Sequence, residues 1–367
     1  MDPVTKLRLE PPSDEPASQN GEPSLLAPPD AAALVRTLID IDSTTGREAD
    51  VSRWLAAELR RRGWQVTEQP VNGDRCNIFA KLDQPAVVFS THVDCVPPFF
   101  PSRQEGDLVF GRGACDAKGS VATQLVAAER LRLAGSRQIG LLFVVGEERG
   151  SDGARAANML ACGSRYLVDG EPTDNRLGVA TRGVLRVRLR AQGRASHSSY
   201  PELGDSAIEK LVTALVQLRG LDMPEDPVMG RTHYTVGVIS GGVAPNVVPP
   251  SADAEVVFRT VGNMDRLKSS LSSLEPLVTC EEVVEVPPIT TMHVPGFETA
   301  AFPYTTDIPF LDRWGTPLLL GAGSVLVAHT DHEHVRIADL HRAVDQYVKL
   351  AEYLLKESNE QRAMSNE

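Results

Sequence analysis

The chain has 367 residues, of which 42% are hydrophobic and 23% are charged, as in an ordinary globular protein of two or three domains. Its 37 Lys and Arg residues face 49 Asp and Glu residues, so the formal net charge is −12 at pH 7. That balance argues against binding to a nucleic-acid backbone, because a basic surface supplies most of that attraction. It does not exclude small anionic substrates.

No apolar run in the sequence approaches the roughly 18 residues that a membrane-spanning helix needs. The first residues also lack the basic and then apolar pattern of a secretory signal. The five cysteines are scattered without a C-x-x-C pair, which favours a reducing compartment over a disulfide framework. These features predict a cytoplasmic protein with neither a membrane nor a nucleic acid as its partner.

Residues 1–29 are rich in proline and poor in large apolar residues, which predicts a disordered leader. From Asp30, the expected N-cap of a first helix, amphipathic helices alternate with apolar strands. Nearly continuous apolar strands in this order favour a buried, mostly parallel sheet with helices on its faces. The predicted helices span 30–39, 51–59 and 120–133, and the predicted strands span 64–67, 77–81, 86–90 and 139–145.

The pattern changes after Gly183. Residues 184–190 alternate between apolar side chains and arginine, as expected for a half-exposed antiparallel strand. The elements that follow complete the order β-α-β-β-α-β, which is the split motif of a small open sandwich. They are helices over 205–218 and 264–274 and strands over 234–239, 252–259 and 278–286.

From about Thr290 the α/β pattern returns, and it ends in a long helix predicted over 337–355. The sequence therefore predicts a large α/β domain of residues 30–182 and 290–367. A small α+β domain, residues 183–289, is inserted into it.

Polar side chains follow several of the apolar strands. His92 and Asp94 come directly after one strand and are two positions apart, so both would project from the same face. Ligands of open α/β sheets bind at this edge, and a carboxylate beside an imidazole can fix the tautomer of a metal-binding histidine. By itself, the pair also fits a strand that ends in two polar residues whose hydrogen bonds are satisfied and which have no chemical role.

Two further acidic motifs lie next along the chain. Asp116 follows the glycines Gly111 and Gly113 before a helix, and a lone Asp there is often only an N-cap. Glu147 and Glu148 follow another apolar strand. Because adjacent residues leave a strand in opposite directions, one carboxylate could bind metal while the other moves protons. The alternative is that these two glutamates are an ordinary pair on the protein surface without a chemical role.

Asp169 and Glu171 follow a further apolar strand, and His329, His332 and His334 follow a glycine-rich turn. Clusters at five strand ends are hard to explain as solvated surface. Together they supply imidazoles and carboxylates for a two-cation site, with one carboxylate able to bridge. The sequence has no G-x-S-x-G, Walker or H-E-x-x-H motif, so serine-hydrolase and P-loop chemistry have no comparable support.

From about residue 31 to 355, the chain resembles the di-zinc aminoacylase/carboxypeptidase family, which includes acetylornithine deacetylase and succinyl-diaminopimelate desuccinylase. The resemblance implies two zinc ions, with cobalt or manganese as other metals that such ligands accept. It rests on an ordered set of motifs: His92-x-Asp94, Asp116, Glu147-Glu148, Asp169-Gly-Glu171-Pro-Thr and Ala328-His329.

By this resemblance, Asp116 would bridge the two ions. One ion would also be held by His92 and Glu171, and the other by Glu148 and His329. These five residues are the predicted metal ligands.

The resemblance also assigns residues that act beside the ions. Asp94 would orient His92, and Glu147 would be the general base that takes a proton from water and passes it to the leaving amine. Of the three clustered histidines, only His329 fits the family pattern A-H-x-x-x-E, which Glu333 completes.

The inserted domain would then be a lid and dimerisation domain, and we call residues 183–289 the lid. His197 lies in a segment that resembles the family motif whose histidine reaches a neighbouring subunit's active site to stabilise the oxyanion. Asn246 and Arg259 fall at substrate-contacting positions, and Arg259 would grip an α-carboxylate. The resemblance implies a homodimer joined by pairing of the lid's exposed edge strand. A loop histidine without a catalytic task is the alternative for His197.

Residues 304–310 and 318–324 are most similar to acetylornithine deacetylases, although Ala322 departs from the proline common in that turn. The sequence thus favours hydrolysis of N2-acetyl-L-ornithine to L-ornithine and acetate, in arginine biosynthesis. Other small N-acyl amino acids stay open as substrates: N-acetyl-lysine, N-acetyl-citrulline, N-succinyl-diaminopimelate and dipeptides. A metal-binding homologue without catalysis is the alternative from another class, yet neither Glu147 nor any predicted ligand is missing.

Overall fold

The computed structural model describes residues 26–364. Of the leader predicted over residues 1–29, only residues 26–29 fall within the described part, and they form no helix or strand. The next residue, Asp30, caps helix α1 (Ala31–Ile39) by accepting a hydrogen bond from the backbone N–H of Ala33 at 2.8 Å. The predicted cap of the first helix is therefore confirmed.

The large domain is built on a mixed sheet of nine strands. They are β1 (Gln65–Asn72), β2 (Arg75–Lys81), β3 (Val87–His92), β6 (Ile139–Val144), β7 (Tyr166–Asp169), β8 (Leu177–Thr181), β15 (Ile289–Thr290), β16 (Thr299–Phe302) and β17 (Thr316–Leu319).

The strand order of this sheet is β1-β2-β6-β3-β7-β17-β8-β15, with β16 also paired to β8. The central strands β6, β3, β7 and β17 run parallel to one another. Every residue of β3, β6 and β7 is buried, as expected for strands covered on both faces. The predicted fold class is confirmed.

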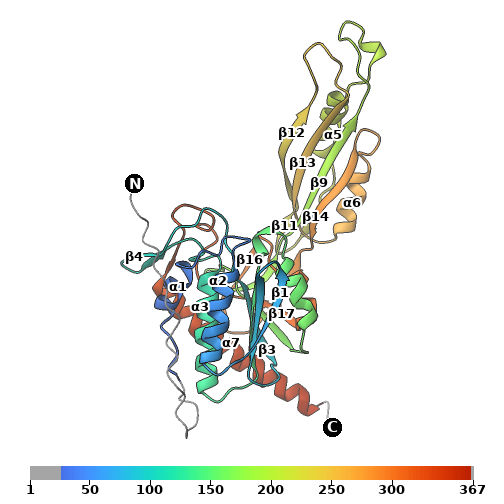
Figure 1. The fold of residues 1–367 in the computed structure, drawn as a ribbon. Helices are drawn as coiled ribbons and strands as arrows, with labels where there is room; N and C mark the ends of the chain where they lie inside the picture. Colours follow the sequence, from blue (N-terminus) through green and yellow to red (C-terminus); the bar gives the residue numbers. More distant parts are fainter. Residues whose placement is uncertain (1–25, 365–367) are drawn as a thin grey trace, which may run out of the picture.

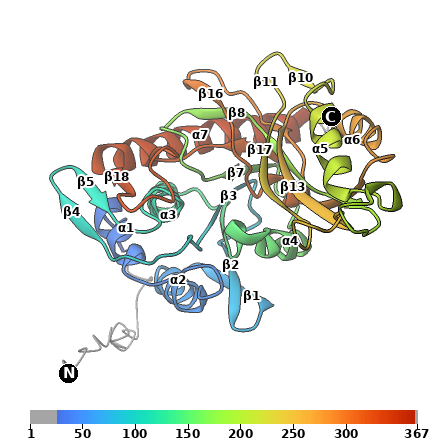
Figure 2. The same cartoon turned by 90° about the horizontal axis from the view of Figure 1, so that it is seen from above.

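Helices cover both faces of the large sheet. On one face, α1, α2 (Ala49–Arg61), α3 (Lys118–Leu133) and α7 (Ile337–Met364) share the main hydrophobic core with the strands. Helices α1, α3 and α7 lie side by side there (Figure 2). The other face packs against α4 (Asp152–Ala157) and Trp314. Within residues 26–364, no helix has both the length and the apolar character needed to cross a membrane.

A small sheet in the order β18-β5-β4 flanks the large domain; its strands are β4 (Arg103–Glu105), β5 (Leu108–Phe110) and β18 (His334–Arg336). Gly111 follows β5 with a φ of 150°. A Cβ at this position would collide with the side chain of Ile39, so only glycine lets the chain pass α1 here. The chain then turns through Asp116 into α3.

The lid has the predicted order of elements. Its elements are β9 (Gly183–Gln192), α5 (Ala207–Leu218), β12 (His233–Gly241), β13 (Ser251–Thr260), α6 (Met264–Ser272) and β14 (Thr279–Val286). The strands form an antiparallel sheet in the order β12-β13-β9-β14. A short hairpin of β10 (Glu225–Asp226) and β11 (Gly230–Arg231), which the sequence pattern did not predict, precedes β12.

Only one face of the lid sheet is covered by its helices. The buried side chains of β9, such as Leu185 and Val187, pack with α5 and α6 into a second hydrophobic core. The alternate side chains, including Arg186 and Arg188, point to the uncovered face, as the alternation predicted. Figure 1 shows the lid standing away from the large domain.

The two chain connections between the lid and the large domain pass each other at Gly183. A Cβ on Gly183 would collide with the backbone oxygen of Val286 and crowd the nitrogen of Pro288. Glycine is therefore required where the first connection enters β9 and the second leaves β14. Directly after this crossing, β15 rejoins the large sheet beside β8.

Candidate metal centre

The structure brings the five predicted metal ligands together as two groups that share Asp116. His92 and Glu171 lie with Asp116 in one group, and Glu148 and His329 lie with it in the other. Within each group, the potential ligand atoms all lie within 4.8 Å of one another. Residues far apart in the sequence thus meet at one place, as the predicted two-cation site requires.

Asp116 lies between the two histidines. Its Oδ1 is 3.1 Å from Nε2 of His92, and its Oδ2 is 3.2 Å from Nε2 of His329. On the outer sides, Glu171 Oε1 lies 3.9 Å from His92 Nε2, and Glu148 Oε1 lies 2.9 Å from His329 Nε2. Each oxygen of Asp116 thus faces a different group, which is the arrangement that a bridging carboxylate needs.

Asp116 does not come from the end of a strand of the large sheet, contrary to the expectation of five such ends. It lies in the loop between β5 of the small sheet and α3, and Ala117, not Asp116, is the N-cap of α3. The side chain is therefore free of a capping role and faces the two histidines.

Glu147 and Glu148 lie on a short 3₁₀ helix, η1 (Glu147–Arg149), and not on a strand. Gly146 has a φ of 78°, in the left-handed region, and turns the chain out of β6. The strand-based reason for separating the two carboxylates was therefore wrong. Both carboxylates line the cleft described below, but only Glu148 belongs to a ligand group, where it lies 2.9 Å from His329.

Asp94 holds more than the imidazole of His92. The Nδ1 atom of His92 lies 3.0 Å from the backbone oxygen of Asp94 and 3.4 Å from its Oδ1. The same carboxylate accepts hydrogen bonds from the backbone N–H of Glu147 at 3.1 Å and of Glu148 at 3.3 Å, and from the Thr45 hydroxyl at 2.9 Å. It therefore fixes η1 against β3, and no sequence signal pointed to Thr45.

Glu333 ties the loop of His329 to the loop of Asp116. It is fully buried, and its Oε2 lies 2.7 Å from the Arg112 guanidinium. Its Oε1 accepts hydrogen bonds from the backbone N–H of Cys115 at 3.3 Å and of Asp116 at 3.2 Å. The sequence pattern had singled out Glu333 without a role, and the partner Arg112 was not foreseen.

Buried negative charge is in excess around the two groups. Burial raises the pKa of Glu171 well above its ordinary value, and nearby Asp116 adds to the rise against the opposing effect of His92. Burial also raises the pKa of Glu147 well above its ordinary value, and it raises the pKa of Asp169 to about 8.

The residues present fit a pair of divalent cations. Imidazole nitrogens and carboxylate oxygens are ligands of zinc, cobalt and manganese, and the shared Asp116 offers one oxygen to each position. Crowded buried carboxylates are unfavourable without a countercharge, and cations in these positions would supply it. His92 and Glu171 would complete one site, and Glu148 and His329 the other.

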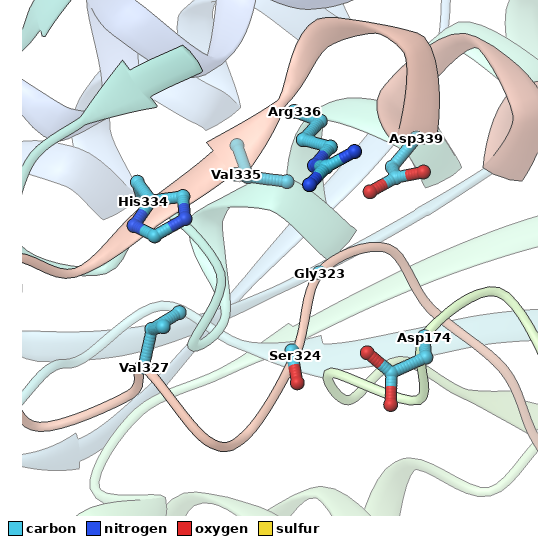
Figure 3. A pocket seen from close by; sticks show the side chains of 8 residues that line it. All are labelled: Asp174, Gly323, Ser324, Val327, His334, Val335, Arg336 and Asp339. Carbon is cyan, nitrogen blue, oxygen red and sulfur yellow. The ribbon is translucent and has the colours of Figure 1, made fainter.

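The other two clustered histidines lie outside both groups. His332 is largely exposed and pairs with Asp331 at 2.9 Å. His334 lines a separate pocket of about 270 Å³ beside β18, together with Arg336 and Asp339 (Figure 3). Among the three, only His329 lies with other potential ligands, in line with the predicted choice.

A cleft of about 440 Å³ runs between the large domain and the lid, beside the metal centre. Its lining includes Glu147 and Glu148 from η1, and Arg259 from β13 of the lid. Arg259, predicted as a substrate-binding residue, thus lies in the same cleft as the predicted general base.

His197 and Asn246 lie together but not in this cleft. The backbone N–H of Ser198 donates to the backbone oxygen of Asn246 at 3.0 Å, and His197 forms a β-bridge with Val247. Both lie in the loops that follow β9 and β12, at the end of the lid remote from the large domain (Figure 1). Both side chains are exposed. Within one chain, neither contributes to the lining of the cleft.

Comparison with known proteins agrees with this fold and site. The model of peptidase family M20/M25/M40 matches residues 88–353. A peptidase M20 domain-containing protein of Schizosaccharomyces pombe is 36% identical over 338 residues, covering 88% of this chain and 84% of the relative. A probable carboxypeptidase of Aspergillus clavatus is also 36% identical, covering 88% and 82%. The chain therefore belongs to the M20 peptidase family, and it is a hydrolase of that family.

Solved structures show the same fold at lower identity. A tripeptidase of Staphylococcus aureus superposes with a TM-score of 0.75 at 19% identity, covering 89% of this chain and 98% of that one. A dinuclear metal-binding peptidase of the M20 family from Bacillus subtilis superposes with a TM-score of 0.68 at 14% identity, covering 89% and 98%. The narrower resemblance to acetylornithine deacetylase gains no support from these relatives and stays a prediction.

Proposed function

We propose that this protein hydrolyses the amide bond on the amino side of an amino acid whose α-carboxylate is free, using two divalent cations. The observation that carries the proposal is the pair of ligand groups sharing Asp116, placed beside Glu147 in the interdomain cleft. Cations held by these residues would supply Lewis acidity to polarise the amide carbonyl and to acidify water.

The chain's own residues have distinct tasks in this proposal. Glu147 accepts a proton from the attacking water and delivers it to the leaving amine. Its position in the cleft, next to the second ligand group but outside it, supports this role. Asp94 holds both His92 and the turn that carries Glu147. Arg259, on the lid side of the cleft, binds the substrate's α-carboxylate.

The proposal covers both N-acyl amino acids and short peptides. The Aspergillus clavatus relative is named a probable carboxypeptidase, and that name suggests peptides with a free C-terminal carboxylate. The sequence resemblance favours N2-acetyl-L-ornithine, with N-acetyl-lysine, N-acetyl-citrulline and N-succinyl-diaminopimelate as alternatives. All of these substrates present the same amide bond and the same neighbouring carboxylate.

We also propose that the protein acts as a homodimer formed through the lid. Strand β12 is one of the two edge strands of the lid sheet, and its Val238 and Ile239 are 57% and 62% exposed. An unpaired apolar edge of this kind is suited to pairing with a second copy. His197, remote from its own chain's cleft, would then complete the site of the other subunit as an oxyanion donor.

The test is metal-dependent hydrolysis by the purified protein. Bound metal is removed from the protein with a chelator, and the protein is reloaded with Zn²⁺, Co²⁺ or Mn²⁺. It is then assayed for amine release from a panel of N-acetyl amino acids and of dipeptides with a free C-terminal carboxylate. Activity that disappears on chelation and returns with one of the metals supports the proposal. No hydrolysis of any member by a chain that holds two cations overturns it.

A further inference from the structure

The cleft between the two domains collects more positive charge than one α-carboxylate requires. Three arginines line it: Arg155 from α4 of the large domain, and Arg186 and Arg259 from the lid. Among the described residues that line it, the acidic side chains are Glu147 and Glu148, at the metal centre. The rest of the lining is neutral.

Two of the arginines are close neighbours on the uncovered face of the lid sheet. Arg259 of β13 lies opposite Val184 of β9, and Arg186 is two residues further along β9 on the same face. Diagonal neighbours in a sheet are within reach of long side chains, and like charges there repel each other. An anion between the two guanidiniums would remove that repulsion.

These guanidiniums are poorly neutralised by the protein itself. Glu255 accepts a hydrogen bond from Arg188 at 2.8 Å, and its other oxygen lies 3.5 Å from Nε of Arg186. Within residues 26–364, no carboxylate lies within 4.0 Å of the guanidinium of Arg155 or Arg259. Among the described residues, only Arg186 of the three cleft arginines therefore has a carboxylate within 4.0 Å, and that carboxylate also pairs with Arg188.

Arg155 is held in place without losing its hydrogen-bonding capacity. Its guanidinium lies 3.7 Å from the ring centroid of Phe310, and its Nε is 3.4 Å from the backbone oxygen of Gly150. Stacking on an aromatic face leaves the edges of a guanidinium free to donate. Phe310 and Gly150 also line the cleft, so Arg155 faces the lid arginines from the opposite wall.

We propose that the substrate carries a second carboxylate besides its α-carboxylate, and that Arg155 and Arg186 select for it. The inference rests on the proposed function and names its substrate class: N-acyl or peptide derivatives of an acidic amino acid. It ranks an N-acyl glutamate above N2-acetyl-L-ornithine, because the δ-ammonium of ornithine would be repelled by these arginines. A dicarboxylic acyl group is the other source of the same charge.

The experiment compares substrates matched in shape. The cation-loaded protein is assayed with N-acetyl-L-glutamate against N-acetyl-L-glutamine, and with N-succinyl-L-alanine against N-butyryl-L-alanine. A charged hydrogen-bonded contact predicts a kcat/KM ratio of about tenfold or more in favour of glutamate. A preference confined to the succinyl pair assigns the second carboxylate to the acyl side. Ratios at or below one in both pairs overturn the inference.

Variants show whether the arginines cause the preference. Arg186→Gln and Arg155→Gln are expected to lower kcat/KM for the charged substrate about tenfold more than for the neutral one. Arg190→Gln, on the same strand and face but outside the cleft lining, is the matched control and should leave the ratio unchanged. An equal loss for both substrates in the Arg186 and Arg155 variants overturns the assignment of these residues.

A binding measurement separates this inference from the proposed function. Calorimetry with the Glu147→Gln variant compares the amino acids L-glutamate and L-glutamine as ligands. Tighter binding of glutamate than of glutamine supports the inference if the difference is lost when Arg186→Gln is added to this variant. That result would hold even if no substrate were hydrolysed and the proposed function failed. Equal binding of glutamate and glutamine, together with equal turnover of their N-acetyl derivatives, overturns the inference while leaving the proposed function in place.

Discussion

The carboxylate of Glu333 and the guanidinium of Arg112 form a buried ion pair at 2.7 Å between residues 221 positions apart in the sequence. Both side chains are almost fully buried. Because the second oxygen of Glu333 accepts the backbone N–H groups of Cys115 and Asp116, the pair holds Asp116, the predicted bridging ligand, in position. The stability of the fold and the position of Asp116 are therefore linked through one side chain.

The Glu333→Gln variant is expected to lose about 3–5 kcal/mol in its free energy of unfolding, because a buried arginine is left without its countercharge. Urea denaturation measures this loss, and metal analysis should show reduced cation content. The double variant Arg112→Met/Glu333→Leu should recover stability but not cation content, because the N–H of Asp116 stays unpaired. A Glu333→Gln protein as stable as the wild type would contradict this account.

Removal of one histidine should remove one cation. His329→Ala deletes the imidazole that lies 3.2 Å from Asp116 and 2.9 Å from Glu148, so we expect the bound metal to fall from two ions to one per chain. His332→Ala is the matched control, because that side chain is exposed and pairs with Asp331. Metal analysis after gel filtration checks both. Equal metal content in the two variants would refute the choice of His329.

The Glu147→Gln variant is expected to retain two cations and to lose activity by about 10²–10⁴-fold, the usual contribution of a general base. Glu147 lies outside both ligand groups, so its neutralisation should not expel a cation. Glu352→Gln, at an exposed glutamate on α7, controls for the same change of side chain away from the cleft. Turnover near that of the control would remove Glu147 from the mechanism.

Cation binding should release protons. Hydrogen bonds to Asp116 and Glu148 raise the pKa of His329 to about 10 in the cation-free protein, so the ring is protonated at neutral pH. A metal ligand must be the neutral ring, and cation affinity should therefore rise with pH below about 10. Calorimetry in two buffers of different ionisation enthalpy measures the released protons. His329→Ala should release fewer, and identical heats in both buffers for the wild type would count against this prediction.

Two inactive variants should complement each other if His197 serves the partner subunit. His197→Ala and Glu147→Gln are each expected to be inactive alone. When the two are unfolded, mixed and refolded together, half of the dimers are mixed and contain one complete site, so about a quarter of wild-type activity should return. Analytical ultracentrifugation checks that dimers form. A mixture that stays inactive although mixed dimers form would show that His197 does not act across the interface.

Much of the fold was predictable from local patterns. The apolar runs of β3, β6 and β7 indicated strands buried on both faces, and the alternation in β9 indicated one covered and one open face. The hairpin of β10 and β11 was not predictable, because its two-residue strands are too short to show a period of two.

The residues that the structure brings together at the candidate metal centre were predictable from motifs, but the residues that support them were not. A left-handed Gly146 turns what would have been a continued strand into η1, and the strand rule then failed for Glu147. Thr45 and Arg112 gave no signal, because their roles arise only from contacts with Asp94 and Glu333 that the folded chain creates. Such partners are set by tertiary structure and not by local sequence.

The crossing at Gly183 places one constraint on both connections between the large domain and the lid. Any side chain added at this position would meet the backbone of Val286 and of Pro288 at once. Arg186 and Arg259 belong to the lid, while Glu147 and Arg155 belong to the large domain. The backbone crossing at Gly183 therefore sets how the two walls of the cleft face each other, and a larger side chain at position 183 should alter ligand binding far from any reacting atom.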